Sequence, residues 1–302
     1  MKKFIALIAS LFVVLAAIDT ACGALLDRLT ASATRGYTAR NEFIADKLTS
    51  PVVIFGSSRA VHHYDPKIFR DSLNLGCYNA GQDGMGIILS YGRFRLMTAR
   101  YTPKIIICDV AADFDLDQND NTTYLTWLKP YYHRNAIDSI FWTVDPTMRI
   151  KMMSQMFRYN GKLLQILTDN KPGSSNDDQL RGYVPLDGTM SYDTKEEAIK
   201  PVSVDSVKLS YLNRLAGECS QRGIKLFFTI SPFYNSKSNS AQLHQALYAI
   251  AKKNGIPVLD HFSDKDIAFN KELFQDSYHM NHTGAEMFSR RIAHDIKQML
   301  AN

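Results

Sequence analysis

The stretch Val52–His63, VVIFGSSRAVHH, decides the fold of this chain. Its first four residues are apolar and branched or aromatic, which is typical of a short strand buried on both faces of a parallel sheet. The strand leads into the turn Gly56-Ser57-Ser58, and a helix is expected over residues 62–72. In parallel α/β sheets, ligands bind beyond the carboxyl ends of strands, where the next helix begins. Ser58 is therefore placed as a nucleophile, although a serine at such a turn is often only a helix N-cap.

Further strands of the same kind are expected along the chain. Their apolar runs are Ile105–Ile107, Leu226–Ile230 and Pro257–Leu259. Between them, apolar residues recur at helical spacing over residues 209–219 and 243–250, and each helix is expected to end at a glycine, Gly223 or Gly255. The repeated order of helix, glycine and strand predicts right-handed crossovers and a three-layer α/β/α fold with a central parallel sheet.

The N-terminus carries an apolar segment behind a basic start. Two lysines precede the run Phe4–Ile18, which is the layout of a secretory signal or of an uncleaved signal anchor reaching about Leu26. A buried core helix is the alternative, and the lysines argue against it. Lipidation at Cys22 is disfavoured because Asp19 stands where a lipobox has an aliphatic residue. We expect an exported protein, anchored in a membrane and facing the periplasm or the cell exterior, with a cleaved, secreted form as the alternative.

Three segments follow from these patterns. Residues 1–26 are the export or anchor segment, residues 27–50 a polar stalk expected to be helical, and residues 51–302 one large α/β domain. The regular alternation fails over about 114–205, which we interpret as an inserted lid region over the edge of the sheet that shapes a substrate cleft. Its polar part, residues 169–206, is too long for an ordinary loop.

Methionines at helical spacing mark the middle of this insertion. They are Met148, Met152, Met153 and Met156. The alternative to a cleft is that these methionines form helix core and that the rest of the insertion is a surface loop.

Composition excludes several classes of protein. The chain has 302 residues, is 45% hydrophobic and 22% charged, and has a net charge of +5. These values argue against disorder, fibres and a polytopic membrane protein, and the charge is too small and dispersed to predict nucleic-acid binding. The four cysteines show no metal-binding spacing, and three of them lie outside the N-terminal segment, so neither a zinc site nor a disulfide framework is indicated. No metal or other cofactor is expected, and the sequence does not determine the oligomeric state.

A second chemical motif stands near the C-terminus. Asp276 precedes His279 by three residues, and Thr283 with Glu286 forms a plausible capping box for the last helix. On a tight loop, Asp276 can accept a hydrogen bond from one imidazole nitrogen and leave the other free to take a proton from a serine hydroxyl. Alone the pattern is weak, but it is stronger in a chain whose sheet begins with Gly-Ser-Ser.

Together these motifs resemble the SGNH/GDSL hydrolase superfamily. The turn at Gly56 matches the first block, with Ser58 at the nucleophile position, and Asn79-Ala80-Gly81 matches the second. The stretch 276–279 matches the last block. The resemblance implies a flavodoxin-like SGNH hydrolase fold and a catalytic triad of Ser58, His279 and Asp276.

The third block of that family is not matched here. Residues Asp109–Asp113 contain no Asn that would donate to an oxyanion, so the expected oxyanion hole consists of the backbone amides of Ser58 and Gly81. Loss of one donor typically lowers the rate by about 100- to 1,000-fold. A slower enzyme, an acyltransferase whose insertion supplies the donor and an inactive relative all remain open.

Candidate substrate-binding residues lie next to these motifs. Arg59 follows the nucleophile position and is a candidate for binding an anionic group; alternatively, it lies in solvent or pairs with an acid. The resemblance adds Asn79 of the second block and Asn281 after the last block. His62, His63 and His282 lack the carboxylate spacing of a metal site.

The resemblance is greatest to membrane-anchored envelope proteins that handle acyl groups on polysaccharides. It implies a serine esterase or O-acyltransferase that acts on acyl esters of cell-envelope polysaccharide through an acyl-serine intermediate. Acetyl is the expected acyl group. The alternative is a non-catalytic polysaccharide-binding or assembly subunit that retains the fold.

Overall fold

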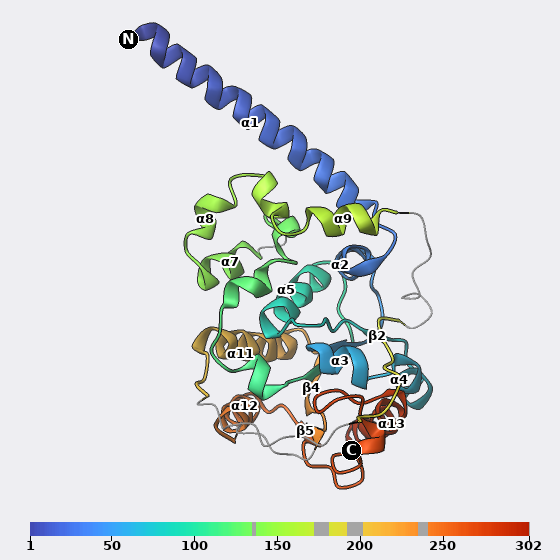
Figure 1. Cartoon of the computed structure of the whole chain (residues 1–302). Helices are drawn as coiled ribbons and strands as arrows, with labels where there is room; N and C mark the ends of the chain where they lie inside the picture. Colours follow the sequence, from blue (N-terminus) through green and yellow to red (C-terminus); the bar gives the residue numbers. More distant parts are fainter. Residues whose placement is uncertain (135–136, 172–180, 192–201, 235–240, 302) are drawn as a thin grey trace. The chain divides into compact units, whose positions relative to one another are not determined.

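A five-stranded, all-parallel sheet forms the centre of the structure, a computed structural model (Figure 1). The residues that it describes are 1–134, 137–171, 181–191, 202–234 and 241–301. The strands are β1 (Val52–Phe55), β2 (Cys77–Asn79), β3 (Ile105–Asp109), β4 (Lys225–Ile230) and β5 (Val258–Asp260). Their order is β2-β1-β3-β4-β5, with Phe55 of β1 paired in register with Cys108 of β3. This order places the switch in winding direction between β1 and β3, the position where such folds bind ligands.

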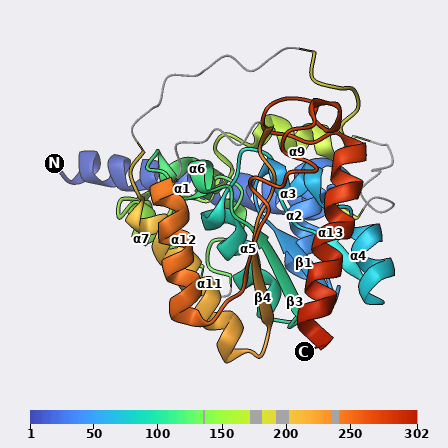
Figure 2. The same ribbon diagram turned by 90° about the horizontal axis from the view of Figure 1, so that it is seen from below.

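Helices cover both faces of the sheet (Figure 2). One layer contains α5 (Ile87–Thr98), α11 (Ser206–Gln221) and α12 (Ala241–Asn254). The other contains α3 (Ser58–His63), α4 (Pro66–Leu73) and α13 (His282–Ala301). The short α6 (Ala112–Asp115) follows β3, and a 3-10 turn, η5 (Lys271–Leu273), precedes α13. The predicted three-layer α/β/α architecture is confirmed, as are the left-handed glycines after α11 and α12, which have φ values of +67° and +65°.

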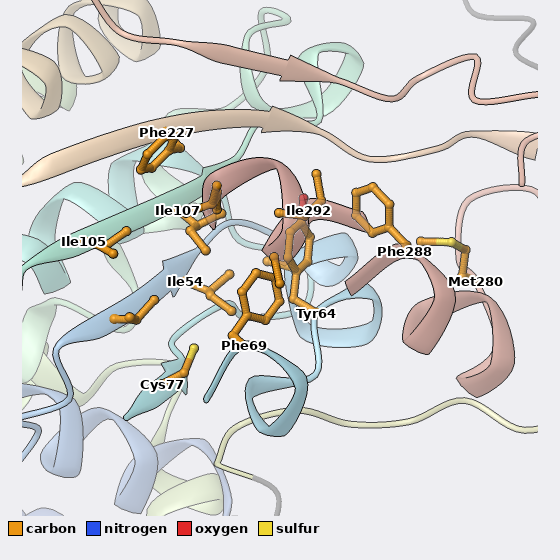
Figure 3. Close-up of a cluster of buried hydrophobic side chains, with 14 of the residues drawn as sticks. Ile54, Tyr64, Phe69, Cys77, Ile105, Ile107, Phe227, Met280, Phe288 and Ile292 are labelled. Carbon is orange, nitrogen blue, oxygen red and sulfur yellow. The ribbon is translucent and has the colours of Figure 1, made fainter. Parts of the chain in front are cut away.

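The hydrophobic core lies between the sheet and the layer of α4 and α13 (Figure 3). Ile54, Ile105 and Ile107 project from the strands, and Phe288 and Ile292 meet them from α13. All five side chains are at most 3% exposed. Burial of such a side chain stabilises the fold by roughly 1.5–3 kcal/mol, so this packing fixes where the ends of β1 and α13 lie.

Two helix predictions are corrected by the structure. The single helix expected over 62–72 is two helices, because Pro66 disfavours helical backbone at Asp65, and the Asp65 side chain caps α4 by accepting from the Lys67 amide. The predicted capping box is wrong: Asn281, one residue before α13, accepts from the Gly284 amide.

Contacts divide the chain into two compact units. The N-terminal unit comprises Met1–Lys47 and Asn121–Ser175, and the sheet unit comprises Leu48–Asp120 and Asn176–Asn302. The helices of the N-terminal unit are α1 (Lys2–Ala31), α2 (Gly36–Asp46), α7 (Asp138–Val144), α8 (Met148–Lys151) and α9 (Leu163–Asp169), with 3-10 turns η1 (Asn121–Leu125), η2 (Lys129–Tyr131) and η3 (Met156–Tyr159). Much of the polar stretch 169–206 lies outside the described residues, and the proposed boundaries at 26, 50, 114 and 205 stay predictions.

The N-terminal unit joins the predicted stalk to the middle of the chain. Leu26 of α1 packs with Tyr159 and Ile166, and the Tyr131 hydroxyl donates to Glu42 of α2 at 2.6 Å. Its methionines divide into two classes, since Met148 and Met152 are buried whereas Met153 and Met156 are exposed. The core interpretation therefore holds for only half of the methionine stripe.

Candidate active site

Ser58, His279 and Asp276 form a continuous hydrogen-bonded chain. The Ser58 Oγ lies 2.8 Å from His279 Nε2, and His279 Nδ1 lies 2.9 Å from Asp276 Oδ2. The separation of the serine and histidine side chains is thus within hydrogen-bond reach without any change of rotamer. With Nδ1–H donating to the carboxylate, Nε2 is the nitrogen that can accept the serine proton.

The first turn of α3 presents Ser58 because the preceding glycine brings the chain very close to β3. Gly56 has φ +149°, and a Cβ on it would lie 2.8 Å from both the Asp109 carbonyl oxygen and Ala60 Cβ. No larger residue fits there without displacing backbone. The tight turn carries Ser58 to the sheet edge, with its amide among the first helical N–H groups, which have no intrahelical acceptor.

Asp276 holds the loop that carries the histidine. Its Oδ1 accepts from the backbone amides of Tyr278 and His279, at 2.7 and 2.9 Å. Burial raises the pKa of Asp276, but the hydrogen bond and charge of His279 and the two amides outweigh burial, so the pKa lies below its usual value. Asp276 is therefore a carboxylate at neutral pH, as required to stabilise an imidazolium.

Two further histidines pack around His279, and the sequence suggested no role for them. His63 is fully buried, and its Nε2 accepts from the Met280 amide at 3.0 Å, next to the catalytic candidate. Burial, with the charges of His279 and Arg59, holds the pKa of His63 well below its usual value. His63 thus acts as a neutral acceptor that fixes the backbone beside His279.

His62 also packs against that ring. Its ring centroid is 5.5 Å from that of His279, its Nδ1 is 2.7 Å from the Val184 carbonyl oxygen, and its Nε2 is 3.1 Å from Asp83 Oδ1. Both neighbours are acceptors, so the ring is held by a polar contact at each nitrogen. The His62-His63 pair after Ser58 was the available sequence signal, since residue 62 follows the nucleophile by one helical turn.

The expected oxyanion hole is only partly formed. The Gly81 amide donates to Asn79 Oδ1 at 3.0 Å, so this donor is already engaged. A Cβ at Gly81 would lie 2.8 Å from Ala60 Cβ, so the glycine is required for close packing of the loop on α3. Of the two amides named from the sequence, that of Ser58 is the one left for a ligand.

The two asparagines expected to bind substrate instead make hydrogen bonds within the protein. Asn79 is fully buried and donates to the Ala60 and Tyr64 carbonyl oxygens at 2.6 and 2.9 Å. Asn281 donates to the carbonyl oxygens of Gly188 and Glu272 and caps α13, and its exposed fraction is 5%. The structure thus places both asparagines as loop supports.

Arg59 follows the alternative of pairing with an acid. Its side chain is 5% exposed, and Nη2 lies 3.0 Å from Asp113 Oδ1. Asp113 belongs to the stretch where the family has its third-block Asn, so this region supplies an ion pair to α3.

Buried carboxyls occupy the remainder of the third-block region. Asp109 accepts from the Tyr64 hydroxyl at 2.6 Å, and burial raises its pKa. Asp115 accepts from the Ala111 amide, and burial raises its pKa to about 7. In the part of the chain that the structure describes, no group of three or more His, Cys, Asp or Glu side chains is arranged to bind a metal ion.

Neither a family model nor a curated protein matches the sequence. Solved structures similar to it include a lipolytic protein of the G-D-S-L family from Desulfitobacterium hafniense, with 11% identity, a TM-score of 0.42, and coverage of 81% of this chain and 98% of that one. The esterase EstA from Pseudoalteromonas sp. has 12% identity and a TM-score of 0.44, covering 83% and 98%. The acetyl xylan esterase AlAXEase has 11% identity and a TM-score of 0.40, covering 82% and 98%. These likenesses are distant, with identities of 11–12% and TM-scores of 0.40–0.44.

Proposed function

We propose that the chain is a serine ester hydrolase or O-acyltransferase that works through an acyl-Ser58 intermediate. The observation that carries this proposal is the pair of short contacts, 2.8 Å from Ser58 Oγ to His279 Nε2 and 2.9 Å from His279 Nδ1 to Asp276. Serine is a weak nucleophile unless an oriented base takes its proton. The contacts of His279 with Ser58 and with Asp276 support the roles of base, nucleophile and orienting carboxylate.

The reaction begins when Ser58 Oγ attacks the carbonyl carbon of an ester and its proton passes to His279 Nε2. The tetrahedral intermediate then collapses, the bond to the alcohol oxygen breaks, and that oxygen takes the proton from Nε2. Water attacks the acyl-serine in a hydrolase, and a second hydroxyl attacks it in a transferase, with His279 again accepting and returning the proton. Asp276 stabilises the imidazolium in both halves of the reaction.

The oxyanion is proposed to rest on the Ser58 amide first. The Gly81 amide can donate to the oxyanion only after its hydrogen bond to Asn79 breaks. Using this second donor therefore costs more free energy than using a donor that already points at the oxyanion. Since one missing donor typically lowers the rate by about 100- to 1,000-fold, we expect slow turnover on small activated esters.

The proposed substrate is an acyl ester of a cell-envelope polysaccharide, and acetyl is the proposed acyl group. The support is the resemblance of the motifs together with α1, a helix of mean hydropathy 2.4 over its most apolar window that exposes residues 1–18. Lysines at positions 2 and 3 favour a cytoplasmic N-terminus, because basic flanks stay inside. The sheet unit would then face the periplasm or the cell exterior.

A fluorophosphonate probe and an acetyl-ester assay test the chemistry directly. We expect the full-length protein to be labelled on Ser58, as located by mass spectrometry, and to hydrolyse 4-nitrophenyl acetate. The matched control is Ser57→Ala, since Ser57 is the neighbouring buried serine and its side chain makes no capping hydrogen bond. Loss of labelling in Ser58→Ala but not in Ser57→Ala supports the proposal, whereas an unlabelled, inactive wild-type protein contradicts it. Acetylated glycans with and without an acceptor sugar then separate transferase from hydrolase.

A non-catalytic polysaccharide-binding subunit is the second candidate. The engaged Gly81 amide and the lack of a third-block Asn favour it, because the first occupies an expected oxyanion donor and the second leaves the site without a side-chain donor from that block. This candidate requires binding of an acetylated glycan by both wild type and Ser58→Ala, with no acyl transfer by either. Single-turnover mass spectrometry distinguishes it, since an acyl adduct on Ser58 is incompatible with a purely binding role.

A further inference from the structure

Exposed apolar side chains lie on α8, on the η3 segment and on α9 of the N-terminal unit, and η3 and α9 contact α1. We propose that they rest on the surface of a lipid bilayer with anionic headgroups, so that the unit is seated on the membrane as well as tethered to it. The apolar rim consists of Ile150, Met153, Met156, Leu163, Leu164 and Leu167, with exposed fractions from 41% to 77%. This inference rests on the proposed anchoring by α1.

The length of α1 determines where the membrane surface would lie. Residues 1–18 are exposed throughout, whereas Asp19 is partly buried and accepts from the Ser154 hydroxyl. Seventeen residues, 2–18, span about 26 Å at 1.5 Å per residue, close to the roughly 30 Å of a hydrocarbon core. The bilayer surface is therefore expected near Asp19.

Hydrogen bonds to Asp19 hold part of the apolar rim near the expected bilayer surface. The carboxylate of Asp19 accepts from the Ser154 hydroxyl at 2.6 Å and from the Met156 amide at 3.0 Å. Met153 and Met156 flank these donors and are 77% and 41% exposed. Four residues further along α1, a Cβ at Gly23 would lie 2.4 Å from the Gln155 Cβ, so this segment packs directly on the helix. The exposed methionines thus lie beside the end of the apolar span.

The exposed face of helix α9 carries apolar side chains. Leu163, Leu164 and Leu167 are 46%, 76% and 54% exposed, while Ile166 points inward and packs on Leu26 of α1. A surface helix of a soluble protein normally has polar residues on its outer face. Figure 1 shows α9 beside the base of α1. A concentrated apolar surface next to a membrane helix is what an interfacial contact requires.

Charge favours an anionic lipid surface over a second protein as the occupant. Residues 145–171 contain five basic residues and two acids. Asp169 is buried and accepts from the Thr38 amide, and Asp145 pairs with Lys151, whereas Arg149 is exposed beside Ile150. Basic residues are attracted to anionic headgroups, and apolar residues between them are typical of interfacial segments. Two copies of such a basic surface would repel each other.

Depth-dependent quenching on the full-length chain tests the proposal. A Cys22→Ser background leaves three buried cysteines, and bimane is attached at Met153→Cys, Leu164→Cys or Val13→Cys in nanodiscs of phosphatidylglycerol and phosphatidylcholine. The matched control is Met299→Cys, a methionine 45% exposed on α13 of the sheet unit. We expect brominated acyl chains to quench labels at 13, 153 and 164 at least about twofold more than the label at 299, and iodide in the water to do the reverse.

Each pattern of quenching decides between occupants. A label at 13 quenched by lipid, with labels at 153 and 164 as open to iodide as the label at 299, overturns the rim proposal and leaves α1 as an anchor. Labels at 153 and 164 protected from both quenchers indicate a covering protein, such as a second copy, and also overturn it. Labels at 13, 153 and 164 all open to iodide overturn the anchoring itself, independently of the Ser58 chemistry.

Discussion

The loops after β1 and β3 reach the same edge of the sheet, but they direct their polar side chains differently. After β1, Ser58 is partly exposed and hydrogen bonds to His279, which is itself held by Asp276. At the carboxyl end of β3, Asp109 is 1% exposed and bonded to Tyr64, and in the loop that follows, the Asp115 carboxylate accepts from the Ala111 amide. The β1 loop therefore carries groups that can react, whereas the β3 loop carries groups that support the fold.

This difference shows how a site can retain a triad while the neighbouring loop supplies no side-chain donor. The carboxylate of Asp113 pairs with buried Arg59, so the β3 loop braces the helix that presents Ser58. Changes after β1 should then act on rate, and changes after β3 should act on stability.

The largest expected effect follows removal of the nucleophile. Ser58→Ala should lower kcat for acetyl-ester hydrolysis by about 10⁵- to 10⁶-fold, because the acyl-enzyme route is lost. Steady-state kinetics with 4-nitrophenyl acetate measure this, and urea unfolding checks that the fold is intact. A variant that retains more than about a tenth of the wild-type rate would place the nucleophile elsewhere.

Removal of the negative charge of Asp276 should have a smaller effect on the same reaction. Asp276→Asn keeps the size of the side chain but loses the carboxylate that orients Nδ1–H and stabilises the imidazolium, so kcat should fall by about 10³- to 10⁴-fold. The pH–rate profile is the second readout, because partial recovery at high pH is expected if the histidine base is impaired. An unchanged kcat would show that the contact of 2.9 Å is only structural.

Asp115 tests the supporting role of the β3 region through pH. Burial raises its pKa from 3.8 to about 7. Between these two pH values Asp115 keeps its proton in the folded state, whereas the same carboxyl group is ionised in the unfolded state. This contribution to stability is present below about pH 4 and is lost as the pH rises towards about 7, on the order of a few kcal/mol at 1.4 kcal/mol per pKa unit.

Asp115→Asn should flatten this dependence. Urea unfolding from pH 4.5 to 8 measures it, with Asp71→Asn as an exposed control. A slope that persists in Asp115→Asn would assign it to another group, such as Asp109, whose pKa burial also raises.

The smallest effect is expected at the ion pair between Arg59 of α3 and Asp113. Asp113→Ala leaves the Arg59 guanidinium buried without its carboxylate, and since Asp113 is itself 28% exposed, the free energy of unfolding should fall by about 1–3 kcal/mol. The value of kcat/KM should stay within about threefold of wild type. A selective loss of activity at unchanged stability would instead give Arg59 or Asp113 a part in the reaction and remove the contrast between the two loops.

Much of this arrangement follows from local patterns. The run Val52–Phe55 is a strand at the predicted bounds, because four consecutive apolar branched or aromatic residues before a Gly-Ser turn are typical of a short strand covered on both faces. The glycines that end α11 and α12 were also predictable, since left-handed backbone favours glycine. The split of the helix after Ser58 was missed although Pro66 signals it locally.

The sequence by itself therefore determined the parallel sheet, the turn that presents Ser58, and a D-x-x-H loop able to orient a base. Only the tertiary structure decided the partners of individual polar groups. The Gly81 amide is bonded to Asn79, Arg59 is turned to Asp113, and His63 supports the backbone beside His279. Periodicity and turn chemistry act over a few residues, whereas the partner of a buried donor is chosen among groups that are distant in the chain and meet only when the sheet and its helices pack.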